Sequence, residues 1–248
     1  MSKKKIVIFS GAGLDAESGV ETFRGGSNST WNNYKVDEVA TIDGWRKNRS
    51  KVLDFYNERR KQMPDVQPNS AHIALSKLED KYDVINVTQN VSDLLERGGS
   101  KNIIHLHGEL TKACDVMTKK NKYSIGYNDI ELGVKCPETD SQLRPDIVWF
   151  GEMPYRVDEA YDAVYNADVL LIVGTSLQIT YTLDMLNNVR QTVSATSNPC
   201  RIIYIDPAPM RYLDNYGLSV EYVTKGAVEG VNEVVERIIE EEKLTNNK

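Results

Sequence analysis

Short apolar runs alternate with segments of helical periodicity along most of this chain. The apolar runs predict buried strands at residues 3–9, 82–87, 103–106, 146–150, 168–173 and 201–205. The helical periodicity predicts helices at residues 36–62, 69–78, 157–166 and 228–244. Strands that alternate with helices are typical of a parallel, doubly wound sheet, so we predict a Rossmann-like α/β fold.

Residues 109–142 interrupt this regularity, because lysines, glycines and two cysteines replace the apolar pattern there. We expect a small irregular insert over this stretch. The chain of 248 residues is long enough for one large α/β domain or for one domain that carries such an insert.

Small or polar residues end five of the predicted strands. In chain order the endings are SGAG, TQN, HLHG, GTS and IDP. Ligands of open parallel sheets bind at the carboxyl ends of the strands. These endings therefore predict one crevice lined with hydrogen-bonding groups.

The first strand runs into the glycine turn Gly11-Ala12-Gly13. A strand, closely spaced glycines and a helix start bind phosphates, because the backbone can approach the ligand and the first N–H groups face it. However, the G-x-G-x-x-G fingerprint is missing, and no acidic residue ends a second strand about 20 residues further on. A plain tight turn therefore remains an alternative to a cofactor site.

Charge and cysteine content narrow the class of protein. The net charge of −6 and the pI of about 5.3 argue against a general nucleic-acid binder. The start of the chain lacks a signal-peptide pattern, and no apolar run approaches the ~20 residues of a membrane span. Three cysteines without a secretion signal suit a reducing compartment. We expect a cytoplasmic monomer without nucleic-acid or membrane partners.

Several motifs together resemble those of the sirtuins, the NAD-dependent protein-lysine deacylases. Residues 11–25 are similar to the family's GAGxSxxSGIPxFRG signature, and residues 88–90 to the start of its TQNID motif. His107-Gly108 resembles the family's HG motif, while residues 144–152 and 174–177 are similar to RPxVVxFGE and GTSL. The motifs occur in the family's order and cover nearly the whole chain.

The resemblance implies a reaction and a domain division. NAD would be the co-substrate, nicotinamide would leave, and the acyl group of a protein lysine would pass to ADP-ribose. We expect a Rossmann-like domain of residues 1–31, 66–106 and 145–248. Residues 32–65 and 107–144 would form a smaller inserted domain, with a helical module and a degenerate zinc-ribbon-like module.

Residues 55–60, FYNERR, are similar to the FYxxRR helix of the class III sirtuins, which remove succinyl and malonyl groups. The resemblance implies that Tyr56 and Arg59 bind the acyl carboxylate. Residues three apart share a helix face, and a guanidinium fork with a phenol suits a carboxylate. The alternative is an ordinary charged helix surface.

The chain has three histidines, and the resemblance makes His107 the general base, with Asn90 as a second catalytic residue. A histidine suits this task because its pKa is near neutrality. His105 and His107 alternate along a strand, so only one of them can face the crevice, and Gly108 favours His107. A structural role for this histidine remains an alternative. His72 lies on a predicted helix and is expected to be structural or at the surface.

The resemblance also implies a set of binding residues, although each cofactor position alone could be a strand-end turn and Val148 to Phe150 could be core. The cofactor-binding residues would be Gly11, Ala12, Gly13, Asp15, Ala16, Phe23, Arg24, Trp31, Gln89, Asn90, Ser92, Gly174, Thr175, Ser176, Asp206 and Ala227. The acyl-lysine would contact Tyr56, Arg59, Val148, Trp149, Phe150 and Gly151.

Several positions depart from the family's motifs. Ser92 stands where TQNID has its Asp, and the neighbouring Asp93 is a candidate to replace that carboxylate. In the family this Asp helps to orient a ribose. The other departures are Asp15 for Ser, Glu21 for Pro, Asp206 for Asn and Tyr181 for Pro.

Structural zinc is not expected. Such sites commonly use two CxxC pairs, but Cys114 is followed by Met117 and Cys136 by Thr139, so half of each pair is missing. We predict no metal and two free thiols.

Three functions are compatible with these features. The first is an NAD-dependent deacylase that removes succinyl and malonyl groups and also acetyl groups. The second is an ADP-ribosyltransferase or NAD hydrolase on the same scaffold, which Ser92 keeps open. The third is a non-catalytic NAD-binding module, against which His107 argues.

Overall fold

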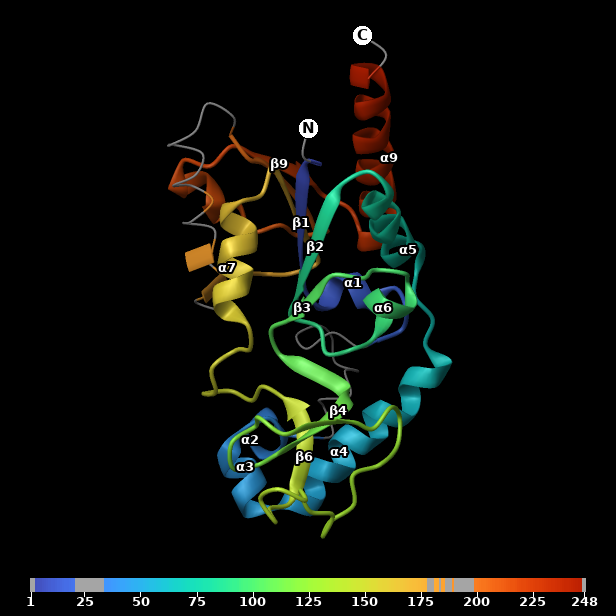
Figure 1. Cartoon of the computed structure of the whole chain (residues 1–248). Helices are drawn as coiled ribbons and strands as arrows, with labels where there is room; N and C mark the ends of the chain where they lie inside the picture. The colour runs from blue at the N-terminus through green and yellow to red at the C-terminus, as the bar shows by residue number, and fades with distance from the viewer. Residues whose placement is uncertain are drawn as a thin grey trace.

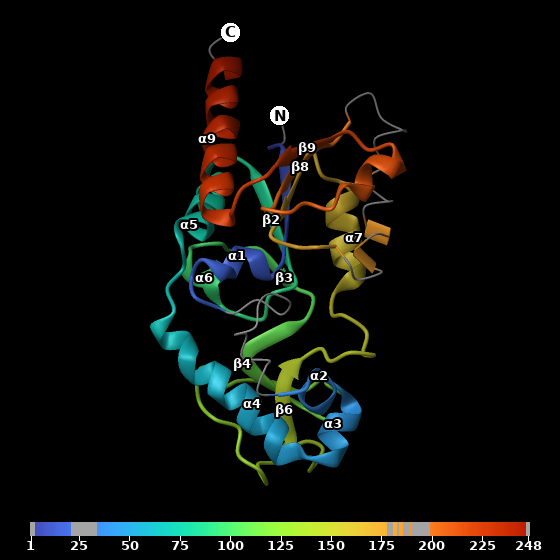
Figure 2. The same cartoon turned by 180° about the vertical axis from the view of Figure 1, so that it is seen from behind.

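The structure is a computed structural model that describes residues 3–20, 34–177, 181–182, 184–185, 189 and 199–246. It has a large part built on a parallel sheet and a small part built on an antiparallel sheet, one below the other in Figure 1. Helix α9 extends from the end of the large part that is remote from the small part (Figures 1 and 2).

The large sheet is parallel at every pairing and has the strand order β3-β2-β1-β7-β8-β9. Its strands are β1 (Lys5–Ser10), β2 (Asp83–Thr88), β3 (Ile103–His105), β7 (Val169–Val173), β8 (Arg201–Ile205) and β9 (Val220–Val223). The order of the strands reverses between β1 and β7, which makes this the switch point where ligands of such sheets bind. The predicted doubly wound parallel sheet is confirmed, although β9 was not predicted from its short, half-buried sequence.

Helices cover both faces of this sheet. One face carries α1 (Ala12–Ala16), α5 (Ser70–Lys77), α6 (Leu94–Arg97) and α9 (Ala227–Asn246), and the other carries α7 (Val157–Tyr165). Ile6 and Ile8 of β1 pack into the first core, whereas Val7 and Phe9 pack into the second. A strand buried on both faces reads as a continuous apolar run, which is why β1, β7 and β8 were predictable.

The small part contains a three-stranded antiparallel sheet with the order β5-β4-β6. Its strands are β4 (Gly108–Asp115), β5 (Lys122–Ser124) and β6 (Leu143–Ile147). The expectation of an irregular insert over residues 109–142 was therefore wrong for β4 and β5. The strand predicted at 146–150 is β6, which begins earlier and pairs with β4. Buried polar residues such as Arg144 and Asp146 obscured the apolar pattern of β6.

The helix predicted over residues 36–62 is three helices, α2 (Val36–Val39), α3 (Ile42–Lys47) and α4 (Arg49–Gln62). Thr41 and Asn48 begin the second and third helices, because their side chains accept hydrogen bonds from the N–H groups of Gly44 and Lys51. These helices share a core with β4 and β6, in which Trp45 lies against Trp149. Short 3-10 helices complete the described elements at η2 (Met63–Asp65), η3 (Leu78–Asp80) and η4 (Arg211–Tyr216).

Within the described residues, no helix combines the length and apolar character needed to cross a membrane.

Candidate active site

The turns that follow β1 and β7 meet backbone to backbone. The N–H of Gly13 donates to the carbonyl of Gly174 over 2.8 Å. A Cβ atom on Gly13 would lie 2.6 Å from the Cα of Gly174, and Gly174 has a φ of +59°. Side chains are therefore excluded where the two turns cross, and the glycine turn is held at the switch point of the sheet.

Asn90 is fixed to this glycine turn. Its side-chain amide donates to the carbonyl of Gly11 over 3.0 Å, and its backbone N–H donates to the Thr88 hydroxyl over 3.1 Å. The hydroxyl of Ser10 in turn donates to Thr88 over 2.9 Å. The carboxyl ends of β1 and β2 thus place a buried amide at the carboxyl edge of the sheet.

His107 lies at the end of a chain of hydrogen bonds that starts at the β7 turn. Thr175 Oγ1 donates to Gln89 Oε1 over 2.8 Å, and Gln89 Nε2 donates to the Tyr181 hydroxyl over 3.2 Å. The Tyr181 hydroxyl is 2.6 Å from His107 Nε2. Burial lowers the pKa of His107 to about 4, although a backbone hydrogen bond with Gln89 acts in the opposite direction. The imidazole is therefore neutral at pH 7 and able to accept a proton.

His105 has different partners. Its Nε2 lies 2.7 Å from Glu96 Oε1, and its Nδ1 lies 3.3 Å from the carbonyl of Asn90. The side chains of the two histidines thus have different surroundings, as the alternation along the strand predicted. His72 is fully buried and its Nδ1 accepts from the N–H of Asn69 at the start of α5, so it has a structural contact.

Asp15 and Ser92, two of the departures from the family pattern, lie side by side. The Ser92 hydroxyl donates to Asp15 Oδ2 over 2.6 Å, and His72 Nε2 lies 3.1 Å from Asp15 Oδ1. Asp93 does not take the place of the missing carboxylate, because its side chain binds the Tyr127 hydroxyl and pairs with Arg97. The carboxylate at this place in the site comes from position 15.

The remaining predicted cofactor residues follow the sheet edge. Ser176 is exposed in the β7 turn, and Asp206 follows β8, where its carboxylate accepts from the N–H of Ala208 over 2.8 Å. Ala227 begins α9, and in the first turn of this helix the N–H of Val228 donates to the carboxylate of Glu17. Phe23, Arg24, Trp31 and Glu21 lie outside the described residues.

The segment after β6 connects His107 to the small part. The N–H of Val148 donates to the carbonyl of His107 over 2.8 Å, and the indole N–H of Trp149 donates to the Tyr56 hydroxyl over 3.1 Å. Phe150 is exposed, and Gly151 has a φ of +86°. Four of the predicted substrate residues therefore form one continuous strip that runs from the histidine to α4.

Sequence reasoning did not identify the charged pair that supports this strip. The guanidinium of Arg144 binds both carboxylate oxygens of Glu152 over 2.9 and 3.0 Å and lies 3.3 Å from the centre of the Trp149 ring. Glu152 also accepts from the N–H of Trp149 over 2.8 Å. The signal was the opposite charge at the two ends of the motif RPDIVWFGE.

Tyr56 and Arg59 lie on the same stretch of α4, but their side chains contact different neighbours. Tyr56 is buried, and burial raises the pKa of its hydroxyl to about 12. Arg59 NH1 donates to the carbonyl of Phe55 over 2.8 Å, and its guanidinium lies 3.3 Å from the centre of the Phe55 ring. The positive charge of Arg59 still acts on Tyr56, since it lowers the pKa of that phenol.

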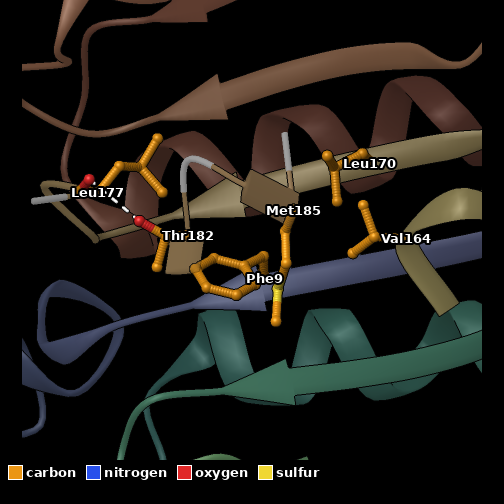
Figure 3. Close-up of a pocket in the computed structure, with 6 residues that line it drawn as sticks. All are labelled: Phe9, Val164, Leu170, Leu177, Thr182 and Met185. Atoms are coloured by element: carbon orange, nitrogen blue, oxygen red, sulfur yellow. Dashed lines mark hydrogen bonds between the residues drawn. The ribbon is translucent and has the colours of Figure 1, made fainter. Parts of the chain in front are cut away.

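A small apolar cavity lies behind the β7 turn (Figure 3). Its lining consists of Phe9, Val164, Leu170, Leu177, Thr182 and Met185. The hydroxyl of Thr182 is turned to the carbonyl of Leu177, to which it donates over 3.0 Å. A lining of this kind does not suit a charged dinucleotide, so the cavity is a packing space and not the cofactor site.

The cysteines of the small part have separate partners. Cys114 Sγ is 3.9 Å from the carbonyl of Pro145, whereas Cys136 Sγ is 3.1 Å from Glu138 Oε2. Among the described residues, the group of side chains close enough to share a metal ion is Glu96, His105 and Glu109, and it includes neither cysteine. The donors around the two thiols do not fit a structural zinc site, and a metal-free small part stays a prediction.

Comparisons with known proteins agree with this arrangement. A family model described as the Sir2 family matches residues 11–181. A protein of Helicobacter pylori (strain ATCC 700392 / 26695) named "NAD-dependent protein deacylase" is 42% identical over 240 residues, which cover 96% of this chain and 98% of that protein. A protein of the same name from Bacteroides thetaiotaomicron is 38% identical and covers 95% and 98% of the two chains.

Solved structures have the same fold. A mutant Sir2 homologue in complex with ADP-ribose has a TM-score of 0.85 and 33% identity, and the match covers 98% of this chain and 94% of that one. A Sir2 homologue in complex with NAD has a TM-score of 0.82 and 33% identity, with 96% and 90% covered. The motifs, the fold and the extent of these matches show that the chain belongs to the Sir2 family.

Proposed function

We propose that this protein is an NAD-dependent protein-lysine deacylase. The observation that carries the proposal is the position of His107, a neutral histidine between the glycine turn and the strip of residues 148–151. Its ring nitrogen Nε2 lies 2.6 Å from the Tyr181 hydroxyl on the cofactor side, and its backbone carbonyl accepts from the N–H of Val148 on the acyl side. A base in this position can act on a group that lies between a dinucleotide and an acyl-lysine.

The residues at the carboxyl edge of the sheet fit NAD. The glycine turn lets the backbone approach a pyrophosphate, and the amides of Gln89 and Asn90 suit a ribose and a carboxamide without adding charge. Thr175, Ser176 and Asp206 offer hydroxyl and carboxylate groups for a second ribose. The remaining residues of this proposed set are Gly11, Ala12, Gly13, Asp15, Ala16, Phe23, Arg24, Trp31, Ser92, Gly174 and Ala227.

Bound NAD supplies an electrophilic ribose carbon and nicotinamide as the leaving group. The protein's part is to hold and orient the reactants and to move one proton. His107 accepts this proton at Nε2 from a substrate hydroxyl that takes the place of the Tyr181 hydroxyl there, and Asn90, whose amide Gly11 fixes, orients the reacting group. Trp149, the buried member of the strip after β6, excludes water from its own part of this region.

The pair of Asp15 and Ser92 supports a complete cofactor site. The family's Ser and Asp have exchanged places in this chain, and a hydroxyl–carboxylate hydrogen bond joins the two positions. The absence of Asp at position 92 was the reason to consider an ADP-ribosyltransferase or NAD hydrolase. Because Asp15 supplies a carboxylate, Ser92 is no longer a reason to favour an ADP-ribosyltransferase or NAD hydrolase.

We further propose that acidic acyl groups are preferred. Tyr56 ends the strip that starts at His107, and its phenol has a proton to donate in addition to the bond it accepts from Trp149. Arg59 is one turn further along α4 and supplies the positive charge. The acyl chain would lie along Val148, Trp149, Phe150 and Gly151, with succinyl and malonyl carboxylates at its far end and acetyl as a weaker substrate.

The wider setting of the enzyme is also a proposal. We propose a large domain of residues 1–31, 66–106 and 145–248 and a small domain of residues 32–65 and 107–144, although the boundary at residue 145 falls within β6. We propose acyl-lysine proteins as substrates and a monomer that acts in the cytoplasm without nucleic acid or membrane.

Incubation with acyl-lysine peptides and NAD tests the function. Mass spectrometry of succinyl-, malonyl- and acetyl-lysine versions of one peptide should show NAD-dependent loss of the acyl group, fastest for the acidic ones. If no acyl group is lost in the presence of NAD, the proposed function is wrong. If only acetyl is lost, the roles of Tyr56 and Arg59 are wrong and the deacylase remains.

A further inference from the structure

Tyr181 is in direct contact with the proposed base. Its hydroxyl oxygen is 2.6 Å from His107 Nε2, and the two rings meet edge to face, with centres 6.1 Å apart and an angle of 85°. The Tyr161 hydroxyl donates to the carbonyl of Tyr181 over 3.4 Å. The contact with His107 places the phenol on the nitrogen that would receive a proton.

The direction of the hydrogen bonds assigns the tautomer of His107. Thr175 donates to the carbonyl oxygen of the Gln89 side chain, so the amide nitrogen of Gln89 faces Tyr181 and donates to its oxygen. A phenol that accepts from Gln89 has its own proton left for His107 Nε2. Nε2 is then an acceptor, and the ring proton is on Nδ1.

We propose that Tyr181 is a positioning residue for His107. Its hydroxyl holds the imidazole in the Nδ1–H tautomer and couples this tautomer, through Gln89, to Thr175 in the β7 turn. Hydrogen bonds that point the same way along a chain strengthen one another, so the state of the base responds to the cofactor-side end of the chain. The inference rests on the proposed function only for the role of His107 as base.

The bond from Tyr181 also affects when His107 becomes charged. The hydroxyl donates to the neutral ring, whereas the Nε2–H of a protonated ring donates to the phenol oxygen, and the hydrogen bond from the charged donor is the stronger of the two. Of the described side chains hydrogen-bonded to the ring, Tyr181 is the titratable one, and burial raises its pKa to about 12, so it keeps its proton. Removing the hydroxyl should therefore lower the pKa of His107 by roughly 0.5–1 unit, the difference between a charge-assisted and an ordinary hydrogen bond.

Nitrogen-15 NMR of the enzyme without NAD tests the inference with Tyr181→Phe, which removes one oxygen and keeps the ring. The chain has three histidines, so a His107→Gln variant assigns the signals. We expect Nδ1 to be protonated in the wild type. In Tyr181→Phe we expect the Nε2 signal to move downfield and the titration midpoint of His107 to fall by about 0.5–1 unit.

Tyr161→Phe is the matched control, because it removes a hydroxyl from the neighbourhood of Tyr181 without touching the imidazole. Its His107 signals should equal those of the wild type. Thr175→Val removes the far end of the chain and should shift Nε2 in the same direction by less. If Tyr181→Phe does not fold, this second variant still tests the coupling, and wild-type shifts in it would overturn the inference.

Kinetics separate this inference from the proposed function. In an active enzyme, Tyr181→Phe should lower kcat about fivefold and leave the KM for NAD unchanged, the effect of about 1 kcal/mol. Wild-type signals and titration midpoint in a folded Tyr181→Phe variant would overturn the role of Tyr181. If the wild type shows the hydrogen bond but no deacylation, the proposed function fails and the positioning of His107 stands.

Discussion

Ser92 and Asp15 are joined by a 2.6 Å hydrogen bond from the serine hydroxyl to the aspartate carboxylate. Both side chains are buried, at 6% and 3% exposure, and His72 occupies the other carboxylate oxygen. Asp15 supplies a carboxylate where the family has a hydroxyl, and Ser92 supplies a hydroxyl where the family has a carboxylate. Each departure therefore compensates for the other. We infer that the two positions act as one unit.

This exchange predicts a double-mutant result. Ser92→Asp alone places two buried carboxylates against each other, and Asp15→Ser alone removes the charge, so each should lower kcat/KM about 10-fold or more. The double variant restores one carboxylate and one hydroxyl and should recover most of the activity. Steady-state kinetics with one acyl peptide measure the cycle. Additive losses in the double variant would show that the two sites are independent.

The pH dependence of activity should be unusual for a histidine base. His107 acts when it is neutral, and its neutral fraction falls as the pH drops through its pKa of about 4 in the folded protein. The kcat/KM for NAD, which reports on the free enzyme, should therefore stay flat down to about pH 5. A decline centred near pH 6.5, the ordinary value for histidine, would contradict the burial of this ring. His105→Gln is the control that should keep the plateau.

The buried pair of Arg144 and Glu152 should matter for stability. Glu152→Gln leaves the fully buried guanidinium of Arg144 without its counter-charge and should cost about 3 kcal/mol in the free energy of unfolding. Urea unfolding followed by fluorescence measures this cost. Glu159→Gln breaks the exposed pair with Arg156 and should change stability by less than about 1 kcal/mol. Equal losses of stability in Glu152→Gln and Glu159→Gln would contradict the role of the buried pair in supporting residues 148–151.

Arg59→Met should change the choice of acyl group. Losing a charge-assisted hydrogen bond to the carboxylate should lower kcat/KM for a succinyl peptide about 10- to 100-fold. The value for an acetyl peptide should change little, since acetyl has no carboxylate. Arg46→Met removes an exposed arginine of the small part that pairs with Asp43 and should leave the ratio unaltered. Parallel losses for both peptides would contradict a carboxylate-binding role.

Strands with two buried faces were the most predictable part of the fold. β8 has the predicted bounds, 201–205, because each of its residues after Arg201 is apolar or aromatic and buried. The small part was less predictable, since Thr41 and Asn48 cap new helices where the periodicity continues. Its β strands carry buried polar residues, such as Arg144 and Asp146, which interrupt the apolar pattern.

In the candidate site, too, the local motifs were predictable and the long-range contacts were not. Gly11, Gly13, Asn90 and His107 could be identified because each sits in a short motif at a strand end. The contacts that combine them could not, because the Asp15–Ser92 bond joins residues 77 positions apart and the Tyr181–His107 bond joins residues 74 apart. Such contacts depend on the sheet order, which no local pattern contains.

The central claim is that His107 serves a reaction in which NAD is consumed together with an acyl group. Wild type and His107→Ala should be incubated with NAD and a succinyl-lysine peptide, and nicotinamide and deacylated peptide should be quantified in the same samples. We predict equal amounts of the two products in the wild type and a fall in deacylation of about 100-fold or more in the variant, as for the loss of a general base. Nicotinamide released without deacylated peptide, or equal deacylation by both proteins, would contradict the account.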